Sequence, residues 1–144
     1  HNYLNFVLGD LEVEAQNSDA LSVLLDKNGN LAEGKGSNIF LIKDEKLVTP
    51  KEKYVLPGVS REVVIELSKI LEYEMKEDDI DLFDAYNADE AFITSTSFCI
   101  CPVQSLNGRH LKAAEVPGPI TTQLINSYIE LVGFDWYSQY LSKL

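Results

Sequence analysis

Three short segments of this chain carry residue types that could meet a bound molecule. The first is Glu33, an acid at the head of an apolar stretch, with Gly34 and Gly36 close behind it. Glycines let another group approach the backbone closely, so an acid beside them is suited to contact a ligand. An acid at this place is equally typical of a solvated hairpin, and the residues alone leave both interpretations open.

The second segment is the stretch LPGVSR, residues 56–61, which predicts the start of a helix. A Pro-Gly turn comes first, and Ser60 is placed to cap the helix. The backbone N–H groups of Val59, Ser60 and Arg61 would have no partners inside the helix. A helix start beside a glycine turn is suited to bind an anion, although most such starts bind only water.

The third segment is TSTSF, residues 94–98, which follows an apolar strand pattern. Its hydroxyl groups and exposed amides could donate hydrogen bonds to a phosphate. They could equally form a plain turn, because Ser and Thr side chains often bond to their own backbone there.

Composition limits the function classes. The formal net charge of the 144 residues is −11, which argues against nucleic acid or an anionic membrane as a partner. No apolar run approaches the length of a membrane span, and no leader pattern opens the sequence. Cys99 and Cys101 alternate as in a strand and should share one face, without His or Cys neighbours that would complete a metal site. We therefore expect free thiols, a cytoplasmic protein and no metal; His1 and His110 are isolated and form no catalytic pair.

The elements that would position these segments are short and mixed. Hydrophobic spacing predicts an amphipathic helix over residues 3–16, with Leu4, Val7, Leu8 and Leu11 on one side. Further elements are predicted in chain order: strands over 20–26, 37–44 and 44–50, a helix after Gly58, an edge strand or loop over 73–80, a short helix over 81–89, two strands over 90–106, a hairpin at Asn107-Gly108, and a final helix over 116–133 that resumes after Gly133. Such a mixture predicts an α+β fold, or a mixed α/β barrel, in one domain.

The order of the motifs resembles a known family. The motifs that carry the resemblance are a helix containing Tyr3, then EGKGSNIF, TP, LPGVSR, ADEAFITSTS, CPVQSLNGR and PGPIT. Together they resemble the class IV (fold-type IV) pyridoxal-phosphate aminotransferases, the branched-chain and D-amino-acid aminotransferase family. The resemblance covers residues 3 to about 128. It implies the larger C-terminal domain of the D-amino-acid aminotransferase-like fold, a pseudo-barrel of short strands flanked by helices.

The resemblance also implies roles for individual residues. Pyridoxal 5'-phosphate withdraws electrons best when its ring nitrogen is protonated, and Glu33 matches the acid that holds this proton. Tyr3 matches the phenol that bonds the O3′ oxygen of the ring. Four residues match the family's phosphate site: Val59, Ser60, Thr96 and Ser97. Asn38 and Arg61 match supporting positions, and we expect Gly34 and Gly36 to leave room for the ring.

One expected residue falls outside the sequence. In the family the Schiff-base lysine lies five residues before the tyrosine matched by Tyr3, which is upstream of His1. We therefore expect residues 1–144 to be the cofactor-binding large domain alone, lacking the N-terminal small domain and the catalytic lysine, and to be inactive by themselves. A complete enzyme would be a homodimer acting on an amino donor and a 2-oxo acid acceptor.

Two other functions remain open from the sequence. A pyridoxal-phosphate lyase similar to aminodeoxychorismate lyase would use the same fold to release pyruvate. A non-catalytic homologous domain would use the sheet for packing or association, although such a domain has no need of Glu33, Tyr3 and the phosphate-binding residues.

Overall fold

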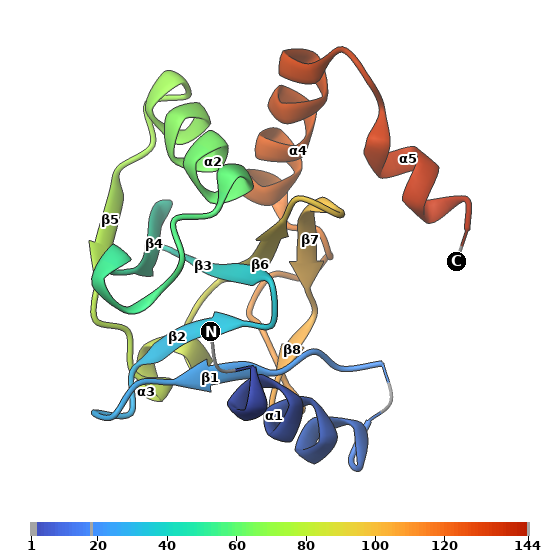
Figure 1. The fold of residues 1–144 in the computed structure, drawn as a ribbon. Coiled ribbons are helices and arrows are strands. Elements are labelled where there is room, and N and C mark those ends of the chain that lie inside the picture. The colour runs from blue at the N-terminus through green and yellow to red at the C-terminus, as the bar shows by residue number, and fades with distance from the viewer. Residues whose placement is uncertain (1–2, 18, 144) are drawn as a thin grey trace.

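The computed structural model describes residues 3–17 and 19–143, and His1 lies outside this part of the chain. Five α-helices and nine strands follow one another in these residues (Figure 1). Their bounds are α1 Leu4–Glu14, β1 Val23–Leu25, β2 Leu31–Gly34, β3 Ser37–Lys43, β4 Lys46–Pro50, η1 Glu52–Tyr54, α2 Val59–Ile70, β5 Met75–Asp78, α3 Leu82–Tyr86, β6 Glu90–Ser95, β7 Cys99–Val103, β8 Ser105–Leu106, β9 Arg109–His110, α4 Pro119–Val132 and α5 Trp136–Leu141. The predicted α+β class is confirmed.

Strand β3 organises the main sheet because it pairs with three other strands. Its start pairs with β2, its end with β4, and its opposite edge with β6 along residues 38–42. Strands β1 and β7 continue the sheet outward from β2 and β6, and all these pairs are antiparallel. Only β4 and β5, among the described strands, pair in parallel.

The sheet is buried on both faces, which explains the unbroken apolar run of β3. Phe40 and Ile42 face α2 and α4, and the Phe40 ring stacks on Phe92 of β6 at 5.0 Å. Ile39 and Leu41 face the other side, where the residues around α3 pack. Figure 1 shows α2 and α4 side by side on one side of the sheet.

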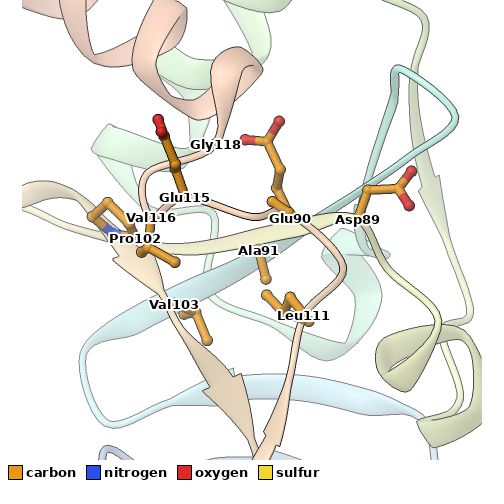
Figure 2. Close-up of a pocket in the computed structure, with 10 residues that line it drawn as sticks. Asp89, Glu90, Ala91, Pro102, Val103, Leu111, Glu115, Val116 and Gly118 are labelled. Atoms are coloured by element: carbon orange, nitrogen blue, oxygen red, sulfur yellow. The ribbon is translucent and has the colours of Figure 1, made fainter.

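Helix α4 begins on a buried acid that the sequence did not reveal. Glu90 of β6 is 5% exposed, and its carboxylate accepts hydrogen bonds from the backbone amides of Ile120 at 3.1 Å and Thr121 at 2.9 Å. Figure 2 shows the Glu90 carboxylate beside Gly118, where an added Cβ would lie 2.3 Å from the carboxyl carbon. The chain therefore supplies its own anion to the start of α4.

Helix α1 forms as predicted, but the side that carries its apolar residues is not covered. None of its residues is buried, and Leu4, Leu8 and Leu11 are each more than half exposed. The helix is held by Asp10, which accepts a hydrogen bond from Ser22 Oγ at 2.6 Å and pairs with Lys35 at 3.4 Å. Within the described residues, no helix has both the length and the apolar character that crossing a membrane requires.

The two cysteines do not share a face, so that prediction is wrong. Cys99 packs against the cluster under α2 and α4, whereas Cys101 packs against the opposite cluster. The reason is the backbone of Cys99, whose φ of 56° places it in the left-handed region and interrupts the alternation of the strand. Both thiols are free.

Candidate functional site

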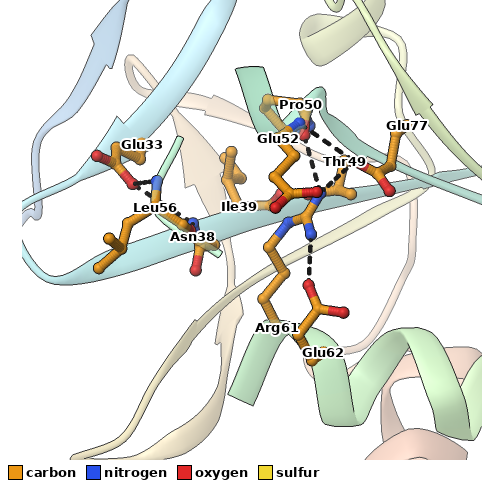
Figure 3. Close-up of polar contacts among 10 residues, drawn as sticks. All are labelled: Glu33, Asn38, Ile39, Thr49, Pro50, Glu52, Leu56, Arg61, Glu62 and Glu77. Carbon is orange, nitrogen blue, oxygen red and sulfur yellow. Dashed lines mark hydrogen bonds and ion pairs between the residues drawn. The ribbon is translucent and has the colours of Figure 1, made fainter. Parts of the chain in front are cut away.

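Glu33 lies on β2 next to the segment that leads into α2. Its Oε2 atom accepts a hydrogen bond from the backbone N–H of Leu56 at 2.8 Å and a longer one from Asn38 Nδ2 at 3.5 Å. Asn38 pairs with Glu33 across the β2–β3 hairpin and also donates to the Leu56 carbonyl at 3.0 Å. Figure 3 shows the three residues in one group. The acid is thus held by its own hairpin and by the approach to α2, and its Oε1 atom has no partner among the described residues.

The approach to α2 is closely packed over Asn38. A Cβ on Gly58 would lie 2.4 Å from Asn38 Oδ1, so a larger residue would force the two segments apart. Gly58 occupies the N-cap of α2 and no side chain caps the helix, so the predicted capping role of Ser60 is wrong. Ser60 lies inside the helix instead, and its hydroxyl donates to the Ser95 carbonyl at 3.0 Å.

The first turn of α2 is open to an acceptor. Among the described residues, the backbone N–H groups of Val59, Ser60 and Arg61 make no hydrogen bonds, because the first bond of the helix runs from Glu62 to Gly58. Val59 is 68% exposed, so the helix end is reachable from outside. Three unpaired donors at a helix end give this point a local positive potential in an acidic chain.

The bond from Ser60 to Ser95 brings the β6–β7 turn to the same helix end. The turn spans residues 96–98, and its Thr96 and Ser97 are exposed. The Ser97 amide donates to Ser95 Oγ at 3.1 Å, so it is already used within the turn. The Thr96 amide and hydroxyl have no partner among the described residues and remain available as donors.

Glu33 and the turn are connected through the sheet. Glu33 pairs with Asn38, and Asn38 pairs with Thr94 of β6, so the three form one row across neighbouring strands. Directly paired residues face the same side of a sheet. Thr94 is 1% exposed, and its buried hydroxyl has no partner in the described part of the chain. A carboxylate, an unpaired hydroxyl and an open helix end therefore lie along one face.

The chain matches a known protein family over most of its length. A family model described as "Amino-transferase class IV" matches residues 1–106. The chain belongs to the class IV aminotransferase family. It is 41% identical over 107 residues to a probable branched-chain-amino-acid aminotransferase of Thermotoga maritima, covering 74% of this chain and 39% of that protein. It is 39% identical over 131 residues to a putative branched-chain-amino-acid aminotransferase of Methanocaldococcus jannaschii, covering 90% and 45% of the two.

The fold agrees with that of solved class IV enzymes. The branched-chain amino acid aminotransferase of Thermobaculum terrenum, solved in its pyridoxal-phosphate form, matches with a TM-score of 0.84 and 36% identity. The match covers 90% of this chain and 42% of that one. The fold class inferred from the motifs is therefore confirmed, and the chain spans less than half the length of these class IV relatives.

Tyr3 is the predicted class IV site residue that no hydrogen bond among the described residues connects to the others. It lies at the start of α1, is 57% exposed, and its ring contacts Phe6 at 5.8 Å. Within the described residues no hydrogen bond joins it to Glu33 or to α2. The other predicted residues are connected: Glu33 reaches the α2 segment through Leu56, and Ser60 reaches the turn of Thr96 and Ser97 through Ser95.

The two glycines behind Glu33 serve the class IV domain's own backbone. A Cβ on Gly34 would lie 2.7 Å from the Ser22 carbonyl oxygen and 2.5 Å from Ser37 Oγ. Gly36 has a φ of 70°, which the hairpin turn requires and which glycine adopts without strain. Gly34 is therefore required by close packing and Gly36 by the turn, and the expectation that they also leave room for a ring stays a prediction.

Arg61 supports the helix start. It is 1% exposed, and its guanidinium bonds Glu77 at 2.7 Å, Glu62 at 2.8 Å and the Pro50 carbonyl at 3.2 Å, as Figure 3 shows. These bonds tie α2 to β4 and β5. The hydrogen bond from Arg61 lowers the pKa of the Glu77 carboxyl below its ordinary value.

Sequence reasoning missed two contributors to this site. The backbone of Leu56 holds the Glu33 carboxylate, and a backbone contact leaves no signal in residue types. Ser95 links α2 to the turn through its carbonyl and accepts from Ser97 through its hydroxyl. The run of hydroxyl residues from Thr94 to Ser97 was a signal that this segment is polar, but it did not show which group bonds which.

Proposed function

We propose that this chain is the cofactor-binding part of a pyridoxal-phosphate-dependent aminotransferase. The enzyme transfers an amino group from a branched-chain-like amino acid, or from an amine, to a 2-oxo acid. The names of the relatives from Thermotoga maritima and Methanocaldococcus jannaschii support this choice of reaction. Membership of the family supports the choice of cofactor.

One observation carries the proposal: a carboxylate and an open helix end are tied together on one face of the sheet. Leu56 bonds Glu33 and lies three residues before Val59, the first residue of α2. A pyridine ring with a phosphate arm presents a ring N–H at one end and a dianion at the other. The residues present fit such a group, because Glu33 Oε1 can accept from the ring and the α2 amides can donate to the phosphate.

Each residue has a defined task in this proposal. The bound cofactor supplies an electron sink for the substrate's Cα carbanion. Glu33 keeps the proton on the ring nitrogen by a charge-assisted hydrogen bond. The Val59 and Ser60 amides and the Thr96 hydroxyl hold the phosphate, with Ser97 completing the turn. Tyr3 donates its phenol hydrogen to the O3′ oxygen, a role that rests on the family motif.

The remainder of the enzyme is also part of the proposal. Residues 1–144 correspond to the larger domain, and the small domain, the Schiff-base lysine and the second subunit of a homodimer belong to the complete cytoplasmic enzyme. The lysine would supply the Schiff-base amine and the general base of the reaction. Residues 1–144 alone should therefore bind the cofactor without completing amino transfer.

Binding of pyridoxamine 5'-phosphate to residues 1–144 tests the cofactor assignment, because this amine form cannot react with surface lysines. We expect saturable binding that is clearly tighter than binding of pyridoxamine, which lacks the phosphate. Equal, weak affinity for both molecules would contradict the proposed phosphate site and favour a non-catalytic domain.

An activity assay on the complete protein that carries these residues tests the reaction. Incubation with a branched-chain amino acid and a 2-oxo acid should yield the new amino acid and the branched-chain 2-oxo acid in equal amounts. Release of pyruvate from aminodeoxychorismate without amino transfer would contradict the aminotransferase assignment and favour the lyase.

A further inference from the structure

The short C-terminal helix α5 contacts the turn that carries Thr96. The Tyr140 hydroxyl of α5 donates a hydrogen bond to the Ser97 carbonyl. On the other side of the turn, the Ser60 hydroxyl donates to the Ser95 carbonyl at 3.0 Å. The backbone of the turn is therefore held at two carbonyl groups by hydroxyls from two different helices.

Holding these carbonyls also orients the amides of the turn. In a planar trans peptide the C=O and the following N–H point in opposite directions. The bond at the Ser95 carbonyl therefore fixes the direction of the Thr96 N–H, and the bond at the Ser97 carbonyl fixes that of the Phe98 N–H. Neither of these amides has a partner among the described residues, so both remain available to a ligand.

Helix α5 is anchored to the core through its first residue. Its first residue, Trp136, is 6% exposed, and the indole meets the Tyr128 ring edge-on at 5.8 Å. Burial raises the pKa of the Tyr128 hydroxyl, which therefore stays protonated and donates to Ser60 Oγ at 3.4 Å. The Asp135 carboxylate caps the helix by accepting from the Ser138 amide at 2.9 Å. Tyr140 of α5 therefore carries one of the two hydroxyls that hold the turn. Trp136 packs on Tyr128, which bonds the other hydroxyl, that of Ser60.

We propose that Tyr140 is a positioning residue for the phosphate-binding turn, and that α5 braces this turn against the open end of α2. The proposal rests on the proposed function, because it concerns the same phosphate site. Tyr140 touches no ligand; it acts through the Ser97 carbonyl, which fixes the direction of the Phe98 N–H and holds the turn that carries Thr96. Helix α5 lies outside residues 1–106, the part matched by the family model.

The test compares Tyr140→Phe with Tyr137→Phe in the full 144-residue chain. Both changes remove one phenol oxygen from α5. The Tyr137 hydroxyl makes no hydrogen bond among the described residues, while its ring packs on Trp136 at 5.7 Å, so it is a matched control. Dissociation constants are measured for pyridoxamine 5'-phosphate, for inorganic phosphate and for pyridoxamine.

Tyr140→Phe should weaken binding of the two phosphate-bearing molecules about three- to tenfold, which is the usual effect of one lost hydrogen bond. Its affinity for pyridoxamine should not change, and Tyr137→Phe should bind all three molecules as the unaltered chain does. A purely structural role for Tyr140 would weaken all three by the same factor or lower only the melting temperature, and either result would overturn the proposal.

The two proposals fail in different ways. If the unaltered chain binds pyridoxamine 5'-phosphate no better than pyridoxamine, the phosphate site and the role of Tyr140 are both wrong. If the unaltered chain prefers the phosphorylated molecule and Tyr140→Phe keeps that preference in full, only the positioning role is wrong.

Discussion

Helices α2 and α4 both begin directly after a Pro-Gly turn, at Gly58 and at Gly118. They differ in whether the backbone amides of the first turn have an acceptor. At α4 the buried carboxylate of Glu90 accepts from two backbone amides, and the helix start is closed by an anion from within the chain. At α2 no acceptor from the described residues reaches the first amides, and the helix start is open.

The difference separates a helix start that the described part of the chain itself satisfies from one that it leaves unsatisfied. Every helix leaves its first N–H groups unpaired, and a buried start needs an acceptor. β6 supplies one at its beginning, where Glu90 lies under α4. At its end the Ser95 carbonyl accepts from the Ser60 side chain and not from a backbone amide of α2. The same strand therefore supplies an acceptor to one helix start and none to the backbone amides of the other, where we propose that the phosphate binds.

Glu90→Ala removes the acceptor at the start of α4 and should have the largest effect on stability. It leaves the Ile120 and Thr121 amides buried without partners, which should cost about 2–4 kcal/mol of unfolding free energy. Urea denaturation measures this loss. Glu90→Gln keeps one acceptor and should lose about 1 kcal/mol; equal stability of Glu90→Ala and the unaltered chain would remove the distinction between the two helices.

Glu33→Gln tests the proposed contact between Glu33, beside the open start of α2, and the ring nitrogen of the cofactor. Glutamine can still accept from the Leu56 amide, so the local structure should persist while the charge is lost. Affinity for pyridoxamine 5'-phosphate should fall about tenfold or more, because charge-assisted hydrogen bonds are the strong ones. Titration calorimetry measures the affinity, and an unchanged dissociation constant would separate Glu33 from the cofactor.

Thr96→Val tests the phosphate end and should have a smaller effect. Valine keeps the shape of the side chain but removes the free hydroxyl from the exposed turn. We expect about three- to tenfold weaker binding of pyridoxamine 5'-phosphate and no change for pyridoxamine. An equal loss for both molecules would show that the hydroxyl supports the fold and does not contact the phosphate.

The smallest expected effect concerns the pH dependence of stability at the ion pair of Arg61 and Glu77, which ties α2 to β5. The hydrogen bond from Arg61 lowers the pKa of Glu77 below its ordinary value of 4.5. The stability from this pair is therefore fully present above pH 4.5 and is lost as pH falls through the lowered pKa. Because Glu77 is partly exposed, the effect is small. Denaturation of the unaltered chain and of Glu77→Gln, repeated from pH 6 to pH 3, should show a stability difference that shrinks in acid.

Local patterns in the sequence were enough to predict most elements. The apolar spacing after Gly58 predicted α2, Asn107-Gly108 predicted the β8–β9 hairpin, and Gly133 marked the break before α5. These features depend on residues close together in the chain. The pairing of β3 with three strands and the parallel β4–β5 pair depend on contacts between distant residues, which periodicity does not encode.

The sequence indicated candidate site residues by type, but not which groups they bond. Motif order indicated Glu33, Val59, Ser60 and Thr96, and their roles stay predictions. What the sequence could not show is that Ser60 bonds the turn instead of capping its helix, or that Glu90 is buried under α4. An acid at the head of the apolar run AFI was the one available signal for Glu90.

The branching of β3 has a consequence for the size of what can bind. β3 lies between β2, which carries Glu33, and β6, which leads to the turn, and neighbouring strands keep a fixed spacing. Two such intervals separate the backbone of Glu33 from that of Thr94, two residues before Thr96, by roughly 10 Å. A ligand that contacts both Glu33 and the turn must therefore extend across the width of β3, so we expect inorganic phosphate to contact only one of the two.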